Sequence, residues 1–301
     1  MKKRLLVIGD AGVRLKLQCE RLPYAGEKAE GIKYAYSPDC LGSAAALCAA
    51  RMGMESVLLA RVGSDSNGAK LMSVLSQMGV DTRFMVKDKE ASTSLTVLID
   101  EDAADTRMIR YKGASSRLTA ADVEEAFNCY PDGVLLRLEG AKESSVAAEK
   151  YAADKDIELF VSAADIDNPA NVHLPKNISV FVADAKSVLA LTEIAPSTPD
   201  AALRAATELG RRSSVKNVVF RMNNGCIYVY DGTYGRLLDQ YSKGHFFCDV
   251  FAPALVTEYI KCGNILAAAR FATAATSLWE ACGETLESVP TTAEVRRDAD
   301  L

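Results

Sequence analysis

The alternation of short apolar runs with helical patterns is the feature that most restricts how this chain can fold. Residues 4–10 form an apolar run stopped by a glycine, residues 42–52 are an alanine-rich helical segment, and residues 56–63 form a second apolar run. After that run, apolar side chains recur at positions 71, 74, 75 and 78, the spacing of an amphipathic helix. Short apolar runs of this kind are typical of strands buried on both faces. The order predicts an α/β fold with a mostly parallel sheet between helices.

The same alternation returns in the second half of the chain. We expect strands at residues 134–138, 157–163, 178–183, 216–221 and 226–230, and helices at 119–129, 142–154, 199–212, 249–261 and 264–280. Thr119, with Asp122 three residues later, resembles a capping box at a helix start. The sequence shows no linker rich in Gly, Pro or Ser and no repeat, so we expect one domain over residues 1–301.

Two stretches interrupt this alternation with the period of a strand. Residues 13–36 alternate polar and apolar side chains around a Pro- and Gly-containing turn, and residues 94–112 do so around a polar turn. A period of two predicts hairpins whose strands have one apolar face and one polar face. We therefore expect a small β-sheet lid over the main sheet, formed by about 13–36 and 94–112.

Composition and charge exclude several classes of protein. The chain is 49% hydrophobic and 25% charged, which is typical of a globular protein with a large core. No apolar run approaches the roughly 18 residues that a membrane-spanning helix needs. The net charge of −5 argues against a nucleic-acid surface, although a helix N-terminus can still bind phosphate locally. We expect neither nucleic acid nor a membrane as a partner.

The eight cysteines and two histidines bear on metal and redox chemistry. No two cysteines have a C-x-x-C spacing, and only His173 and His245 could join them as ligands. This argues against a zinc site, and the scarcity of histidine argues against a histidine-based catalytic triad. Thiols scattered over apolar segments are typical of small core residues in a reducing compartment, so we expect a cytoplasmic protein.

Five short motifs follow one another along the chain. Residues 22–27 fit P-x-x-G-E, residues 61–68 fit R-V-G-x-D-x-x-G, and residues 78–82 fit x-G-V-D-T. Residues 249–251 fit D-x-F, and residues 289–291 contain a closing P-T. In this order and spacing, the set resembles the ribokinase-like (pfkB) family of sugar and nucleoside kinases over essentially the whole chain. The resemblance implies a ribokinase-like three-layer αβα sandwich with a small β lid.

The resemblance implies transfer of the ATP γ-phosphate to a sugar hydroxyl. In the family signature D-T-x-G-A-G-D, the glycines leave backbone N–H groups bare at a helix N-terminus, where they receive phosphate charge. The final Asp takes the proton of the hydroxyl group. The matching positions make Asp249 the catalytic base and the backbone N–H groups of Phe247 and Cys248 the anion hole.

Three more site residues follow from the same resemblance. Gly42 falls in the sugar-binding motif G-G-x-G-x-N, Gly225 in the nucleotide loop T-x-G-x-x-G, and Asp184 in the motif N-x-x-E that helps to place Mg²⁺. They are therefore the expected substrate-binding, nucleotide-binding and metal-binding residues. The resemblance also implies ATP and Mg²⁺ as cofactors of an active enzyme. It further implies a homodimer through the lid, whose one-sided hairpins would present an apolar face.

Most of the chemistry-bearing positions in these motifs carry other residues here. Residues 243–249 read KGHFFCD, so Phe246 and Cys248 replace both signature glycines while the final Asp is kept. Gly12 and Arg14 stand where the family has the Asn and Asp that hold sugar hydroxyls. Such combined losses at the sugar, metal and phosphate positions predict weak or absent phosphoryl transfer.

Two hypotheses remain open on the sequence alone. The first is an ATP-dependent carbohydrate kinase of unusual type, with Asp249 as base beside a degraded anion hole. The second is a non-catalytic pseudokinase that keeps the sheet and lid as a scaffold, binding or partner protein. Asp249 also suits a plain helix-capping or first-turn carboxylate, which the helix dipole favours. Gly42 and Gly225 equally suit turns or close packing.

Overall fold

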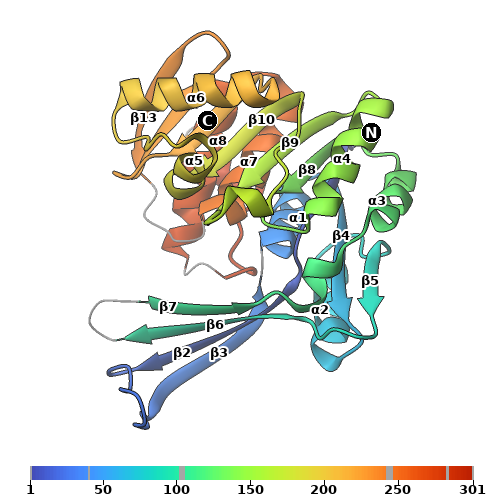
Figure 1. Ribbon diagram of the computed structural model, residues 1–301, viewed down its shortest axis with the longest axis vertical. Helices are drawn as coiled ribbons and strands as arrows, with labels where there is room; N and C mark the ends of the chain where they lie inside the picture. The colour runs from blue at the N-terminus through green and yellow to red at the C-terminus, as the bar shows by residue number, and fades with distance from the viewer. Residues whose placement is uncertain (1, 40, 102–105, 242–246, 283–284, 300–301) are drawn as a thin grey trace.

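A long twisted sheet runs through the centre of the molecule (Figure 1). The computed structural model describes residues 2–39, 41–101, 106–241, 247–282 and 285–299, and within them this sheet has nine strands. In spatial order the strands are β13 (Gly235–Tyr241), β12 (Cys226–Tyr230), β11 (Asn217–Arg221), β10 (Ile178–Asp184), β9 (Glu158–Ala163), β8 (Gly133–Arg137), β1 (Arg4–Ile8), β4 (Glu55–Gly63) and β5 (Met85–Asp88). All neighbouring pairs from β11 to β5 are parallel, and β12 and β13 are antiparallel additions at one edge.

Helices cover both faces of this sheet, which confirms the expected three-layer α/β fold. One apolar cluster joins the sheet to α1 (Leu41–Arg51), α2 (Ser66–Gln77), α7 (Phe247–Cys262), α8 (Ile265–Ala281) and α9 (Thr292–Asp298). The other joins it to α3 (Ala120–Ala126), α4 (Lys142–Asp154), α5 (Ala185–Thr192) and α6 (Pro199–Ser213). Trp279 of α8 is 2% exposed within the first cluster. In the part of the chain described, no helix has both the length and the hydropathy needed to cross a membrane.

Several elements differ from the sequence expectations. The helix expected over 119–129 is α-helical only to Ala126 and continues as a 3₁₀ turn over Phe127–Cys129, and its predicted capping box is present. The short elements α5, α9, β5 and β13 were not predicted. The expectation that the thiols are core residues is wrong for Cys262 and Cys282, which are exposed at helix ends.

A separate four-stranded sheet forms the lid, and Figure 1 shows it extending away from the helical layers. Its strands lie in the order β3 (Gly31–Asp39), β2 (Gly12–Cys19), β6 (Ser94–Glu101) and β7 (Thr106–Tyr111). Pairs β2–β3 and β6–β7 are antiparallel, as the two predicted hairpins require, and β2 and β6 join them in parallel. Because β2 follows β1 after three residues, the lid begins at the carboxyl end of the central sheet.

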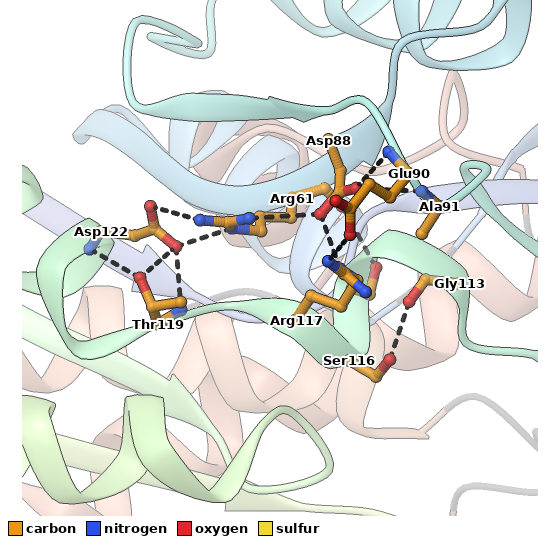
Figure 2. A network of polar contacts seen from close by, with 10 residues as sticks. Arg61, Asp88, Glu90, Ala91, Gly113, Ser116, Arg117, Thr119 and Asp122 are labelled. Carbon is orange, nitrogen blue, oxygen red and sulfur yellow. Dashed lines mark hydrogen bonds and ion pairs between the residues drawn. The ribbon is translucent and has the colours of Figure 1, made fainter.

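A network of ion pairs fixes the base of the lid to the main sheet (Figure 2). The guanidinium of Arg61 on β4 bonds the Asp122 carboxylate at 2.7 and 3.0 Å and the Asp88 carboxylate at 3.2 Å. Arg117 bonds the same Asp88 at 2.9 Å and Glu90 at 2.5 Å. Asp88 and Glu90 lead into lid strand β6, and Arg117 follows lid strand β7. The network therefore holds both ends of the second hairpin against β4.

Candidate functional site

A cavity of about 1080 Å³ is lined by the lid, by residues following the central strands, and by the start of α7. Parallel strands present their carboxyl ends at one edge of a sheet, and ligands of open α/β sheets bind there. Lining residues follow β8, β9, β10 and β11 at that edge. Opposite them, the lid strands contribute one face, whose cross-strand row consists of Ser37, Arg14, Thr96 and Arg110.

Asp249 lies in the first turn of α7 and lines this cavity. Its side chain is buried, with 2% exposure, and burial raises its pKa from 3.8 to about 7 even though Arg137 opposes the shift. Its Oδ1 atom has no hydrogen-bond partner among the described residues and lies 3.8 Å from the Arg137 guanidinium. A buried carboxylate with an open acceptor atom and a pKa near neutrality can take up a proton at neutral pH.

Sequence reasoning missed two charged residues near Asp249, Arg137 and Glu139. Arg137 is fully buried, donates to the Cys248 carbonyl oxygen at 2.7 Å, and lies 3.4 Å from the Glu139 carboxylate. Glu139 accepts a hydrogen bond from the backbone N–H of Ala164, and burial raises its pKa. The sequence does contain a pattern that could have indicated them. Arg137 is a charged residue inside an otherwise apolar strand, and the carboxylate Glu139 follows two positions later.

Two more ion pairs stand at the lid end of the cavity. Arg14 of β2 pairs with Asp39, and Arg110 of β7 pairs with Asp10. Both carboxylates are buried, at 5% and 3% exposure, so each needs its arginine. Arg14, at the position where the resemblance implies an acidic sugar ligand, thus places a cation on the cavity wall with its own counterion beside it.

The expected anion hole coincides with the N-terminus of α7. The helix begins at Phe247, so the backbone N–H groups of Phe247, Cys248 and Asp249 belong to the first turn and have no acceptor within the helix. The Cys248 side chain is buried, its Sγ donates to the Ala163 carbonyl oxygen over 3.6 Å, and burial raises its pKa. The replacement at position 246 lies outside the described residues.

Gly225 and Asp184 line the other end of the cavity. Gly225 has a φ of +86°, and its N–H donates to the Met222 carbonyl oxygen at 3.0 Å, so it closes the turn between β11 and β12. Asp184 caps α5: Oδ1 accepts from the Ser187 N–H at 2.7 Å and Oδ2 from the Asp165 N–H at 2.9 Å. Its neighbour Lys186 pairs with Asp167 at 2.8 Å and Asp165 at 3.4 Å.

These contacts do not fit a dedicated Mg²⁺ site. Each Asp184 oxygen already accepts a backbone N–H, and the Lys186 ammonium supplies positive charge beside it. Nowhere in the described ranges do three or more His, Cys, Asp or Glu side chains gather as a metal would require. Any Mg²⁺ would depend on oxygens that a nucleotide brings with it.

Gly42, the expected substrate residue, is not among the described residues that line the cavity. It lies in the first turn of α1, and a Cβ added there would meet the Asp10 carbonyl oxygen at 2.5 Å and the Gly9 carbonyl carbon at 2.8 Å. This glycine therefore allows α1 to pack closely on the segment that follows β1.

Comparisons with known proteins agree with this architecture. The sequence matches the family described as pfkB family carbohydrate kinase over residues 2–241. It is 28% identical to ribokinase of Bacillus subtilis over 166 residues, which are 54% of this chain and 56% of that protein. It is 22% identical to ribokinase of Haemophilus influenzae over 271 residues, 86% of this chain and 87% of that one. The structure of Arabidopsis thaliana ribokinase complexed with ribose and ATP superposes with a TM-score of 0.87 at 19% identity, covering 100% of both chains.

Proposed function

The chain belongs to the pfkB family of carbohydrate kinases, and on that premise we propose that it transfers a phosphoryl group from ATP to a carbohydrate hydroxyl, with Asp249 as the base. The observation that carries this proposal is the Asp249 carboxylate. It is buried in the cavity wall, its pKa is raised to about 7, and its Oδ1 atom has no hydrogen-bond partner within the described residues. A base with a pKa near the working pH is the most effective one.

The start of α7 supports the phosphate side of the same reaction. The 16-residue helix places its positive dipole end, with the first-turn N–H groups of Phe247 and Cys248, next to Asp249. Each such donor contributes roughly 10²–10³ in rate when it is well placed. Side chains at positions where the family has glycine hinder the close approach of phosphate, so we expect turnover to be slow.

The two ends of the cavity suit two ligands. Arabidopsis ribokinase, with the same fold, holds ribose and ATP. In this chain we assign the nucleotide to the end formed by Asp184 and the turn at Gly225. The carbohydrate then occupies the end formed by the lid, where Arg14 and Arg110 stand. Asp249 would then lie beside the carbohydrate hydroxyl and take its proton, while the hydroxyl oxygen bonds to the γ-phosphorus of ATP and ADP leaves.

A specific observation favours the non-catalytic alternative. The Cys248 side chain stands at the start of α7 where the family signature has glycine, and a Cβ there keeps phosphate oxygens away from the first-turn N–H groups. In this alternative the cavity binds nucleotide or sugar without transfer, and the protein acts as a scaffold or partner.

The kinase and the non-catalytic alternative are distinguished by measuring ADP release and nucleotide binding on the same proteins. The wild type, Asp249→Asn and the control Asp200→Asn are incubated with Mg-ATP and a panel of monosaccharides and sugar acids, and nucleotide binding is followed by thermal shift. Asp200 is a carboxylate in the first turn of α6 and is exposed. We expect a loss of at least about 10²-fold in turnover for Asp249→Asn alone. ADP release that Asp249→Asn leaves intact contradicts this mechanism, and nucleotide binding without any turnover supports the alternative.

The outer face of the lid supports a homodimer. Cross-strand pairing places Tyr34, Tyr36, Leu15, Val97 and Ile109 on the face opposite the cavity-lining row. Tyr34 is 72% exposed and Ile109 is 69% exposed. A broad apolar face on a monomer favours association, and a second copy of the same face covers it by two-fold symmetry.

Light scattering of two matched variants tests this interface. Tyr34→Glu places a charge on the outer face and is expected to yield monomers, whereas Ala35→Glu places it on the opposite face and leaves the dimer intact. A wild-type monomer at micromolar concentration contradicts the interface.

The chemistry of the thiols supports a cytoplasmic location. Seven cysteines lie among the described residues and all are free thiols. Disulfides are rare in reducing compartments and common outside them. We propose that the whole chain, lid included, works there as one domain.

A further inference from the structure

Three cations line the lid end of the cavity. Arg14 and Arg110 lie on the inner face of the lid in one cross-strand row, with Thr96 between them. Because neighbouring strands are about 4.8 Å apart, the backbones that carry the two arginines are roughly 10 Å apart, a span that brackets one monosaccharide. Lys112 directly follows β7 and lines the same end.

The charges at this end do not cancel. Asp39 and Asp10 match Arg14 and Arg110 one to one. Lys112 differs, because its ammonium donates to the Glu139 backbone carbonyl at 3.0 Å and forms no ion pair with any carboxylate of the described residues. No carboxylate in the described part of the chain therefore balances its charge.

The remaining groups nearby do not supply the missing negative charge. Glu139 and Asp249 share the single cation Arg137, at 3.4 and 3.8 Å. Burial raises the pKa of both carboxyl groups, that of Asp249 to about 7. Among the described residues, the lid end therefore carries net positive charge whenever one of these two groups is protonated, and an anionic ligand would neutralise it.

The opposite end of the cavity has the reverse balance. There Asp165, Asp167 and Asp184 stand with two cations, Lys186 and Arg221, and Lys186 is paired with both Asp165 and Asp167. The lid end is therefore the end that favours a free anionic group. The nucleotide assigned to the other end arrives with Mg²⁺, which offsets the charge of its phosphates.

We propose that the carbohydrate acceptor carries an anionic group, a carboxylate or a phosphate, which Lys112 binds beneath the lid with Arg14 and Arg110 flanking it. This inference rests on the proposed function for the identity of the ligand as a carbohydrate. The shared chemistry is one negative group on a monosaccharide: an aldonic acid offers it as a carboxylate and a sugar phosphate as a phosphate. An anion here completes the charge of the site, whereas an uncharged sugar leaves Lys112 unneutralised.

Isothermal titration without nucleotide tests the proposal on matched ligands. D-gluconate is compared with D-glucose, and D-ribonate and D-ribose 5-phosphate with D-ribose, at low and high NaCl. The variants are Lys112→Met and the control Lys261→Met, because Lys261 also donates to a backbone carbonyl, that of Met52 at 2.9 Å, and does not line the cavity. Lys112 is exposed and its partner is neutral, so Lys112→Met leaves no buried charge unpaired.

We expect at least one anionic ligand to bind about tenfold or more tightly than its uncharged counterpart, and high salt to reduce that preference. Lys112→Met lowers affinity for the anion about tenfold and leaves the uncharged sugar unchanged, while Lys261→Met changes neither. The relative affinities of ribonate and ribose 5-phosphate identify the anionic group.

The proposal is overturned if the uncharged sugars bind as well as the anions, if no anion in the panel binds, or if Lys112→Met leaves anion affinity intact. Because binding is measured without ATP, failure of the proposed kinase activity is seen separately. Anion binding without ADP release removes the kinase function and keeps this inference. Turnover of an uncharged sugar that depends on Asp249 keeps the kinase function and removes this inference.

Discussion

Replacement of Asp249 by Asn is expected to stabilise the protein, and increasingly so as the pH rises. Burial raises the pKa of this carboxyl group from 3.8 in an exposed chain to about 7 in the fold. The folded state therefore binds the proton more tightly than the unfolded chain does. Ionisation of the unfolded chain then destabilises the wild type progressively from about pH 4 to about pH 7, and the effect levels off above the folded pKa.

The magnitude follows from these two pKa values. The wild type loses about 2 kcal/mol of unfolding free energy at pH 5 and about 4 kcal/mol at pH 7 relative to a protein with no such group. Asn has nearly the same shape and stays neutral throughout. The difference in unfolding free energy between Asp249→Asn and the wild type should thus grow by about 2 kcal/mol from pH 5 to pH 7.

Urea denaturation of both proteins at pH 5, 6, 7 and 8 measures this difference. Asp200→Asn, in the exposed first turn of α6, serves as the control and should show no comparable trend. A difference that stays constant across this range would show that Asp249 does not titrate near neutrality. A difference that grows in the opposite direction would show that the Arg137 charge outweighs burial, since the ionised carboxylate would then be the favoured form in the fold.

Three further substitutions probe other parts of the account. Gly42→Ala places a Cβ 2.5 Å from the Asp10 carbonyl oxygen, so we expect a loss of about 1–3 kcal/mol in urea denaturation, and an unchanged midpoint would show that α1 moves freely. Cys248→Gly opens the approach to the first-turn N–H groups. ADP release should rise while stability falls by about 2 kcal/mol, from lost helix propensity and lost burial of the side chain, and a lower turnover would argue against a phosphate site there. Arg61→Met should lower the thermal midpoint more than Arg83→Met. The Arg61 side chain is 19% exposed and bridges two carboxylates, whereas the Arg83 side chain is 78% exposed and pairs with one. Equal shifts would mean that the network contributes little to stability.

The layers and the lid could be predicted from the sequence because each depends on local pattern. Apolar runs followed by glycine indicate buried parallel strands, and a period of two indicated the lid hairpins at 13–36 and 94–112, which the structure contains as β2–β3 and β6–β7. Short elements such as α5 and β13 lack that periodicity. They depend on packing against the finished sheet and could not be predicted in this way.

The site was less predictable because its contacts join distant parts of the chain. Asp249 was found through a motif, but its neighbour Arg137 is 112 positions earlier, and only the fold brings the guanidinium to within 3.8 Å. Likewise, the pairing of Arg110 with Asp10 spans 100 positions. The capping of α5 by Asp184 was hidden for another reason, since the same side chain suits a metal ligand and an N-cap equally.

The pH dependence of kcat/KM for ADP release tests the central claim most directly. A base with a pKa of about 7 predicts a rate that is half-maximal near pH 7 and falls about tenfold for each pH unit below it, with a plateau above. A rate that stays flat from pH 5 to pH 8, in a reaction that the wild type demonstrably performs, would contradict the role assigned to Asp249.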